Sequence, residues 1–441
     1  MKKMKYSTLS FWVFALFITP LFSQQVLLKS EAIAIALENN YGVKISNNNI
    51  KIAENNTNIL NSGYLPSLSA NAGATYNRDN TEAEFANGDV TTLNGAESSR
   101  YNAGLNLNYT LFDGLGRRYN YKILKEQYQL SELQARETIE NTIAQLLTVY
   151  YTVAQQSENE RALAETLRIS KNRLTRAEYQ FEYGQSSKLA VLNAQVDINN
   201  DSINVMNASQ QLNNSKRDLG VVLGSPPVNN FEVDTLVTFL MQLNRNELLQ
   251  KAKTNNVALS QIDRSISLSE YNVKLNASSY LPTIGLTGTY GWNKNNNNAA
   301  SFVAGSTNTG LSAGVNLSWN LFDGGGTITR VKNANIELEN QMLQKDELLL
   351  TIETEFNKAW DDYQNKLSIY YVQESNIITS KNNFERTEEQ FKIGQVTSIE
   401  FRQAQLNLLN SEINRNRAKY DAKIAELLVL QLSGELLNIE F

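Results

Sequence analysis

The sequence predicts a mixed α and β membrane protein, in which four transmembrane β-strands per chain are continued by long α-helices packed as antiparallel coiled coils. Three observations support this class. Only 5 of the 441 residues are proline, so few residues are available to interrupt a helix. Four short segments alternate apolar with uncharged polar residues, as the strands of a membrane barrel do. The motifs of the first half return in the second half at a constant offset of 210 residues.

Composition excludes several classes of function. The chain contains neither cysteine nor histidine, which removes disulfides, thiolate metal sites and the Ser-His-Asp triad. The formal net charge of −5 argues against a nucleic-acid partner, which normally requires a basic surface. We therefore expect no catalytic residues, no metal site and no cofactor. An enzyme that uses a carboxylate pair, such as Asp361 with Asp362 or Glu353 with Glu355, is an alternative, although solvated helix faces explain these acids.

The N-terminal residues 1–23 have the pattern of a secretory signal peptide. Three lysines precede an apolar segment that runs from Leu9 to Phe22, and Ser23 is a small residue at a suitable cleavage point. The alternative is an uncleaved membrane anchor, for which the apolar segment is short. No later segment reaches about 18 consecutive apolar residues, so we expect no transmembrane helix in the rest of the chain.

An internal duplication organises the chain. Leu111–Gly114, with the sequence Leu-Phe-Asp-Gly, recurs as Leu321–Gly324, and Arg176–Gln185 aligns with Arg386–Gln395 at the same offset of 210 residues. This period is far too long for a solenoid repeat. The sequence therefore indicates that a whole structural unit has been duplicated.

The duplication predicts the domain limits. Residues 24–224 form the first repeat and residues 246–441 the second, each with the order helix, two strands, long helix and helix. The linker, residues 225–245, begins near two adjacent prolines, which stop a helix. Its apolar segment 231–239 suggests a short strand, which we expect to pack against the helices rather than to separate two mobile domains.

Each repeat holds two segments with period-two alternation. One face of each segment is apolar and the other carries Gly, Ser, Thr and Asn, which suits a strand between lipid and a water-filled lumen. Each segment has about 9–11 residues, the length of a tilted transmembrane strand. The alternative is a soluble sheet that covers a helical layer. The segments are Leu68–Tyr76, Tyr101–Leu111, Ile284–Trp292 and Leu311–Leu321, and the stretches Asn77–Ser99 and Asn295–Asn298 are expected to be loops.

Long helices account for most of the remaining residues. The stretches 115–180 and 327–390 contain no proline and, beyond Gly116, no glycine, and at 1.5 Å per residue each makes a helix of roughly 98 Å. Gly184 and Gly394 then turn the chain into shorter helices. We expect two shorter helices to stack end to end beside each long one, so that both strands emerge at the same end of the rod. The expected short helices span 30–62, 186–222, 247–279 and 396–432.

Four strands per chain require oligomerisation if they cross a membrane. About eight strands are the practical minimum for a closed barrel. An open sheet edge in lipid would leave backbone groups unpaired, which the hydrocarbon region does not tolerate. Chains must therefore pool their strands. This argument alone leaves a dimer, a trimer and a tetramer open.

Taken together, these motifs resemble those of the TolC-like outer-membrane factors, the exit ducts of efflux pumps and type I secretion systems. The resemblance covers essentially the whole mature chain and rests on the tandem repeat and on motifs in a fixed order. These motifs are Glu-Ala-x-x-x-Ala-Leu-x-Asn-Asn at Glu31–Asn40, Tyr-Leu-Pro before each first strand, Leu-Phe-Asp-Gly after each second strand, and Phe-x-x-Gly at each helical tip. The sequence departs from the family at Tyr41 and Gly42, where proline is common, and it lacks the lipid-anchor cysteine of some members.

The resemblance implies a homotrimer in the outer membrane. Its four strands per chain would contribute to a trimeric 12-stranded β-barrel, continued by a long α-helical barrel in the periplasm. Transport would be passive, with a periplasmic adaptor protein and an inner-membrane transporter as partners and with outer-membrane lipid around the barrel. A non-transporting coiled-coil scaffold of the cell envelope is the alternative, and a need for detergent during extraction separates the two. The cargo, the cognate pump and the choice between efflux and protein secretion stay open.

Two sets of candidate functional residues follow from the resemblance. The helical tips are expected to contact the adaptor, with the rings of Phe181 and Phe391 packed inside; a purely structural turn is the alternative. Beyond the second tip, the resemblance places Glu400 and Gln403 at a pore constriction. Threefold symmetry would gather the Glu400 carboxylates there, favour cations and raise the pKa of Glu400, unless Glu400 is a solvated helix residue. The tip residues are Phe181, Tyr183, Gly184, Gln185, Phe391, Ile393, Gly394 and Gln395.

Overall fold

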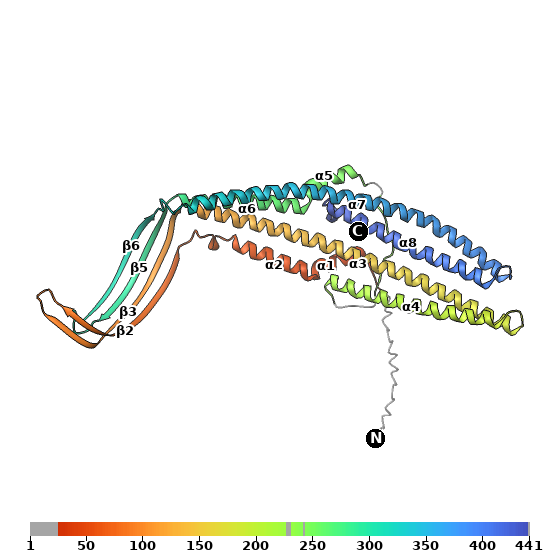
Figure 1. Ribbon diagram of the computed structural model, residues 1–441, viewed down its shortest axis with the longest axis horizontal. Coiled ribbons are helices and arrows are strands. Elements are labelled where there is room, and N and C mark those ends of the chain that lie inside the picture. The colour runs from red at the N-terminus through yellow and green to blue at the C-terminus, as the bar shows by residue number, and fades with distance from the viewer. Residues whose placement is uncertain (1–24, 226–230, 241–242, 440–441) are drawn as a thin grey trace, which may run out of the picture.

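The computed structural model describes residues 25–225, 231–240 and 243–439. It has two parts, an antiparallel sheet at one end and a long helical rod that continues from the sheet (Figure 1). The predicted signal peptide and the two adjacent prolines of the linker lie outside the described residues.

The sheet joins the two repeats through their hairpins. Its order is β2-β3-β5-β6, so the hairpin of the first repeat pairs with that of the second, and β2 and β6 form the edges. In this register Leu105 lies opposite Tyr290 on one face, while Asn106 lies opposite Thr289 on the other. The alternation predicted from the sequence is therefore maintained from strand to strand. The strands are β2 (Ser67–Glu84), β3 (Val90–Asp113), β5 (Thr283–Asn296) and β6 (Gly305–Ser318).

The first hairpin is longer than the sequence predicted. Most of the stretch Asn77–Ser99, expected to be a loop, continues as β2 and β3, which project beyond the second hairpin (Figure 1). The alternation is lost there because the register shifts between Asp79 and Thr81, and because Gly95 has a φ of 67°, which is typical of a bulge. The first two residues of the expected loop Asn295–Asn298 likewise belong to β5.

Two unbroken helices, each of 67 residues, give the rod its length. They are α3 (Gly116–Glu182) and α7 (Gly326–Lys392), as predicted, and at 1.5 Å per residue each is roughly 100 Å long. An aspartate caps the turn before each helix. The Asp113 carboxylate accepts a hydrogen bond from the Arg117 backbone amide at 2.8 Å, and Asp323 accepts the equivalent bond at the start of α7. Both aspartates therefore act as caps of the turns that lead into the long helices.

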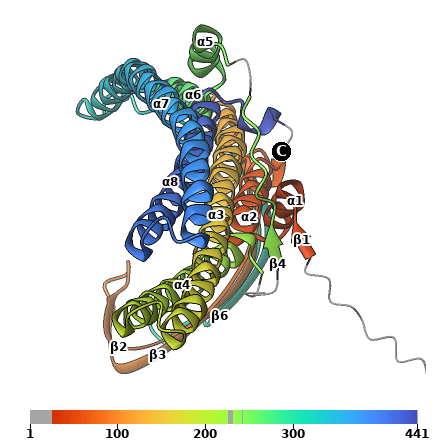
Figure 2. The same cartoon turned by 90° about the vertical axis from the view of Figure 1, so that its right-hand side faces the viewer.

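The chain returns from each long helix through a shorter antiparallel one. These return helices are α4 (Lys188–Leu223) and α8 (Ser398–Leu432). The view along the rod in Figure 2 shows α3 with α4 and α7 with α8 as two hairpins, which are joined where α3 contacts α8. Among the described residues, no helix combines the length and the apolar composition needed to cross a membrane.

The helices that precede the strands are each broken once. The sequence predicted one helix at 30–62 and another at 247–279, but an extended residue, Asn40 or Asn256, divides each of them. Each asparagine caps the helix that follows, and Asn40 Oδ1 accepts a hydrogen bond from the Gly42 amide at 2.8 Å. The pieces are α1 (Lys29–Asn39), α2 (Tyr41–Asn56), α5 (Arg245–Asn255) and α6 (Val257–Ala277), and the 3₁₀ turns Ile59–Asn61 and Ser278–Tyr280 follow α2 and α6.

The end of the neighbouring return helix fixes the position of each break. The Asn40 amide donates a hydrogen bond to the carbonyl of Val222, near the end of α4, at 2.8 Å. Gly224 follows in a left-handed conformation, and a Cβ there would lie 2.4 Å from a backbone oxygen of α1. Asn256 and Gly434 repeat the arrangement in the second copy. As predicted, α4 and α2 therefore lie one after the other beside α3 (Figure 1).

The main core lies midway along the rod, where the linker crosses the helices. Tyr150, Tyr151 and Tyr420 are fully buried there. The linker strand β4 (Phe231–Val233) pairs in parallel with β1 (Gln25–Leu27), and the Tyr150 hydroxyl donates a hydrogen bond to the backbone of β1 at 2.6 Å. The linker is thus packed against the helices, as the sequence predicted.

Candidate functional site at the helical tips

The chain reverses direction at two tips, which lie at the end of the rod farthest from the sheet (Figure 1). One tip joins α3 to α4 and the other joins α7 to α8. Gly184 and Gly394 have φ angles of 74° and 77°, a left-handed conformation that glycine adopts without a steric penalty. Their amides close the turns on the carbonyls of Phe181 and Phe391 at 3.0 and 3.2 Å. The geometry of the turn therefore accounts for both glycines.

Both tips present apolar side chains to solvent. Tyr183 is 76% exposed and Ile393 is 68% exposed, and the neighbouring Gln185 and Gln395 are exposed as well. The two tips occupy equivalent positions in the duplication, so each chain offers the same kind of surface twice. Apolar residues gathered at the exposed end of a rod are suited to contact with another protein.

The two tip phenylalanines differ in their packing. The Phe391 ring stacks on Phe401 with the ring centroids 4.6 Å apart. Phe181 is 42% exposed, and the Lys188 ammonium lies 5.3 Å from its ring centroid. The expectation that both rings pack inside their tips is therefore right for Phe391 and wrong for Phe181. The reason is that Val191, much smaller than phenylalanine, takes the place of Phe401 in the first repeat.

Glu400 lies in the first turn of α8 and forms a capping box with Thr397. Its carboxylate accepts hydrogen bonds from the Thr397 backbone amide at 2.7 Å and from the Thr397 hydroxyl at 2.9 Å. These bonds, the backbone one first, lower the pKa of Glu400. The sequence predicted a raised pKa, but within the chain the shift has the opposite sign because Thr397 stabilises the charged form. The place of Glu400 at a pore constriction stays a prediction.

Gln403 lies beside a groove between the first turns of α4 and α8. Its side chain is exposed and donates a hydrogen bond to Asn407 at 2.9 Å. The groove has a volume of about 460 Å³, and its walls include Leu189 of α4 together with Ile399 and Leu406 of α8. The partly apolar groove thus lies close to both tips and to one of the two predicted constriction residues.

A buried network of charges joins the two hairpins at this groove. Arg402 of α8 donates a hydrogen bond to Asp201 of α4 at 2.7 Å, and Asp201 accepts another from Ser170 of α3 at 2.6 Å. Arg173 of α3 forms an ion pair with Asp197 of α4. The side chains of Asp201 and Arg173 are only 3% and 2% exposed. Loss of one partner would leave a buried charge unpaired, which costs about 3–5 kcal/mol.

The sequence reasoning missed this network, although the two copies contain a signal for it. At the offset of 210 residues, Arg402 corresponds to Leu192 and Asp201 corresponds to Ser411. Charges that occur in only one copy are not required by the shared fold of the repeats, so they point to contacts between the copies. The periodicity of a single helix does not reveal them, because a charge on a helix is usually solvated.

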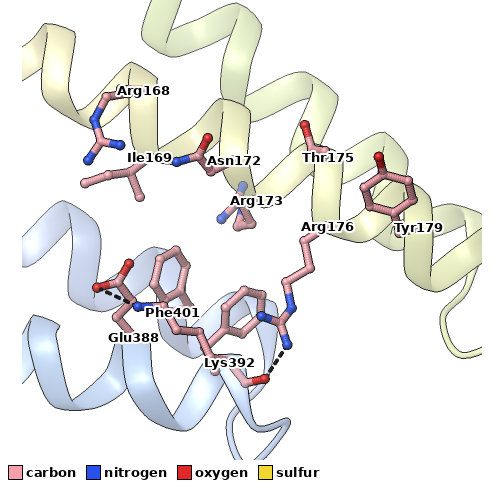
Figure 3. Close-up of a pocket in the computed structure, with 11 residues that line it drawn as sticks. Arg168, Ile169, Asn172, Arg173, Thr175, Arg176, Tyr179, Glu388, Lys392 and Phe401 are labelled. Carbon is pink, nitrogen blue, oxygen red and sulfur yellow. Dashed lines mark hydrogen bonds and ion pairs between the residues drawn. The ribbon is translucent and has the colours of Figure 1, made fainter.

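A second hollow separates the hairpins near the tips. It has a volume of about 390 Å³ and lies between the end of α3, the end of α7 and the start of α8. Figure 3 shows Arg168, Arg173 and Arg176 on the α3 side and Phe401 on the opposite side. Arg176 crosses the gap and donates a hydrogen bond to the backbone carbonyl of Lys392. Polar contacts around the hollow thus connect this part of the hairpins, together with the apolar contact of Ile169 of α3 with the cluster that contains Phe384 and Phe401.

The sheet, the long rod and the exposed tips together define a class, that of outer-membrane channel proteins with a helical part beyond the membrane. The comparison with known families agrees. The sequence matches the family described as outer membrane efflux protein over residues 32–225 and 248–435. The chain belongs to this family.

Individual relatives span most of the chain. The outer membrane protein TolC of Vibrio cholerae is 23% identical over 85% of this chain and 83% of its own length. The outer membrane efflux protein BepC of Brucella suis is 21% identical over 92% of this chain and 85% of its own length. Among solved structures, the CmeC outer membrane channel of Campylobacter jejuni has a TM-score of 0.76 at 18% identity and covers 92% of this chain and 86% of its own.

These findings confirm the predicted class. The chain is a TolC-like protein of the outer membrane whose strands contribute to a β-barrel and whose helices continue into the periplasm, and its function is that of an exit duct. The family is one of trimeric channels that work in tripartite efflux pumps. The relatives are channel proteins rather than enzymes. No finding supports the alternative of a coiled-coil scaffold.

Proposed function

We propose that the protein is the passive exit duct of a tripartite efflux pump or a type I secretion system, which receives its cargo through a periplasmic adaptor and an inner-membrane transporter. The unbroken length of α3 and α7, each of 67 residues, carries the proposal. At 1.5 Å per residue these helices place the tips roughly 100 Å from the sheet. A duct anchored by its sheet in the outer membrane therefore extends far enough into the periplasm to meet an adaptor there.

The proposed duct is a homotrimer surrounded by outer-membrane lipid. The edge strands β2 and β6 each pair on one side only within the chain, and an unpaired edge is not tolerated in lipid. Pairing of β6 of one protomer with β2 of the next would close a barrel from three chains. The apolar face, which includes Leu105, Tyr290 and Trp292, would then contact lipid.

The tips are the proposed contact surface for the adaptor. Tyr183 and Ile393 supply exposed apolar area, and Phe181 adds to it because its ring is partly exposed. Phe391 instead supports the second tip from inside by stacking on Phe401. Gly184 and Gly394 are exposed and have no side chain, which leaves room at the tips for close approach of a partner backbone.

The narrowest part of the duct is proposed at Glu400, with Gln403 beside it. The capping box with Thr397 fixes the Glu400 carboxylate at the start of α8 and keeps it ionised. In a trimer whose helices converge at the tips, these carboxylates would surround one axis and attract cations. We also propose that the chain is organised as repeats 24–224 and 246–441 joined by the linker 225–245.

A double substitution at the tips tests the proposed partner contact. Tyr183→Asp with Ile393→Asp should abolish cross-linking to the cognate adaptor and lower export at least about tenfold, because a contact that buries unpaired carboxylates is strongly disfavoured. Trimer formation and the need for detergent should stay unchanged. The matched control, Tyr183→Phe with Ile393→Leu, keeps the apolar surface and should keep cross-linking and export. Full cross-linking by the aspartate variant would show that the tips do not form the contact.

A further inference from the structure

The polar face of the sheet is almost free of charge. Where all four strands pair side by side, from the row of Ser67 to the row of Tyr76, the only charged side chains are those of Arg100 and Lys294. The remaining polar positions of this region are asparagine, serine, threonine and glycine. A single charged side chain on this face therefore acts on passing ions without a neighbouring charge to compensate for it.

Arg100 and Lys294 lie at the same depth but on opposite faces. Arg100 pairs with Asn295, and the adjacent Tyr101 pairs with Lys294. Because successive residues of a strand point to opposite faces, Arg100 shares the polar face with Asn102, whereas Lys294 shares the apolar face with Tyr101. The apolar face of an outer-membrane barrel meets lipid, so Arg100 faces the lumen and Lys294 faces the lipid boundary.

Arg100 lies at the end of the sheet away from the helices, which is the outer mouth of the duct. Its partner Asn295 is the residue before the last of β5. The Arg100 Nε atom donates a hydrogen bond to Asn295 Oδ1 at 3.1 Å, which holds the guanidinium against the sheet. The next acid on this face is Asp79 of β2, which pairs with Ala96 in the projecting hairpin. It lies about 13 Å along β2 from Thr75, the residue that pairs with Arg100.

A small polar hollow adjoins this guanidinium. It has a volume of about 110 Å³, and Thr75, Asn77, Ser98 and Asn295 are among the residues that line it. Hydroxyl and side-chain amide groups donate hydrogen bonds, and the planar guanidinium group of Arg100 matches the geometry of an oxyanion. The chemistry of the hollow therefore suits a small oxyanion such as phosphate.

We propose that Arg100 forms a cationic ring at the outer mouth that binds small oxyanions and favours anions there. The inference rests on the trimeric duct proposed above, because threefold symmetry is what gathers three copies of Arg100 around one axis. Rings of one charge in a pore set which ions accumulate beside them. With Glu400 at the tips and Arg100 at the mouth, the two ends of the duct carry opposite charge.

Titration of the purified trimer in detergent with inorganic phosphate tests the ring. Arg100→Gln should weaken phosphate binding by about tenfold or more, because the charge-assisted hydrogen bonds of the guanidinium are lost. Lys294→Gln is the matched control, since it removes the same charge at the same depth from the other face, and it should bind phosphate like the wild type. In planar bilayers, Arg100→Gln should lower the permeability of chloride relative to potassium, whereas Lys294→Gln should leave this ratio unchanged.

Two results of the titration would overturn the proposal. One is wild-type phosphate affinity in Arg100→Gln, and the other is an equal loss of affinity in Lys294→Gln. Light scattering on each sample separates this outcome from a failure of the duct itself. If the protein is a trimer and Arg100→Gln leaves its phosphate affinity unchanged, only the proposed anion site is contradicted. If the protein forms no trimer, both the ring and the proposed duct are contradicted.

Discussion

The Arg402 guanidinium lies between the two helical hairpins and is 14% exposed, with Asp201 as its closest acidic partner. Arg402→Ala would leave Asp201 buried without its main counter-charge, and we expect this to cost about 3–5 kcal/mol. The loss should be local, because the core of the rod lies elsewhere. Hydrogen exchange should therefore quicken in α4 around Asp201 and in α8 around Arg402, while exchange around Tyr150 stays slow.

Arg386→Ala is the control for this substitution. Arg386 also lies near the tip end of the rod, but it is exposed, and surface substitutions usually change stability by less than about 0.5 kcal/mol. Its exchange pattern should match the wild type. Equal protection in Arg402→Ala and Arg386→Ala would mean that the buried network does not hold the hairpins together.

The lowered pKa of Glu400 makes the start of α8 sensitive to acid. A carboxyl group whose pKa is lower in the folded state stabilises the fold above its unfolded pKa, and that contribution is lost as the pH falls through the folded value. Thr397→Ala should therefore raise the Glu400 pKa toward its ordinary value, as measured by NMR titration. A wild-type pKa above the ordinary value would instead show that neighbouring carboxylates of a trimer outweigh the capping box.

Tip residues illustrate what the sequence reveals at this scale. Gly184 and Gly394 were predictable because a turn with positive φ admits little else. The exposure of Phe181 was not, because it depends on Val191 across the hairpin, where the second copy has Phe401. The capping box of Glu400 with Thr397 was also missed, because the reasoning considered carboxylates of other protomers rather than a threonine three residues away; the raised pKa expected in a trimer stays a prediction.

Among the elements, the junction between α1 and α2 depends on a glycine in α4's C-terminal cap. Gly224 has a φ of 68°, and a Cβ there would meet a backbone oxygen at 2.4 Å. Gly224→Ala should therefore destabilise the protein by more than the roughly 1–2 kcal/mol that a left-handed alanine costs by itself, because the α1–α2 junction must also move. Chemical denaturation of the trimer in detergent measures the difference.

Gly184→Ala provides the comparison for Gly224→Ala. Its φ of 74° is similar, but nothing lies within 4 Å of a Cβ at Gly184. The substitution at the tip should therefore lower the free energy of unfolding only by the roughly 1–2 kcal/mol that the left-handed conformation costs an alanine. If the two variants lose equal stability, close packing of α4 against the α1–α2 junction contributes nothing measurable.

The elements that the sequence predicted are those whose signals are local. Period-two alternation and long stretches without proline located the four strands and both long helices. The breaks at Asn40 and Asn256 were missed because asparagine is tolerated inside helices, and its capping role depends on the carbonyl of a helix far along the chain, such as that of Val222. The extension of the first hairpin was missed because the irregularity around Gly95 interrupts the alternation.

Across the whole molecule, the linker is attached to the rod by buried charges. Glu426 accepts a hydrogen bond from the Leu240 amide at 3.0 Å, and Lys423 donates to Glu426 at 3.2 Å and to the Thr238 carbonyl at 2.8 Å. Burial lowers the pKa of Lys423, and the Glu426 charge opposes this shift. Glu426→Gln should lower that pKa further and destabilise the fold by about 3–5 kcal/mol near neutral pH.

The pH dependence of this effect follows from its sign. Lys423 needs a counter-charge only while it is protonated, so the deficit of Glu426→Gln should shrink as the pH rises through the lowered pKa of Lys423. Denaturation midpoints at about pH 7 and about pH 9 would show this, since the ordinary pKa of lysine is about 10.4. Asp361→Asn, at an exposed acid, is the control, and a deficit that is independent of pH would contradict the account.

Oligomerisation is the part of the architecture that residue patterns alone left open. Four strands and two sheet edges require other chains, but dimer, trimer and tetramer each satisfy that requirement. The choice depends on strand tilt and on how protomers meet, which are properties of surfaces such as the free edges of β2 and β6. Membership of a family narrows the choice of oligomeric state where local sequence patterns do not.

The parallel pair of β1 and β4 has a consequence for the order of events during export. Lys29, just after β1, forms an ion pair with Asp234, just after β4, although 205 residues separate them in the chain. A secreted chain emerges N-terminus first, so β1 arrives early and its partner arrives only after the whole first repeat has crossed the inner membrane. Contacts of such sequence separation form late. We therefore expect β1 to stay without its partner strand until the linker has crossed the inner membrane.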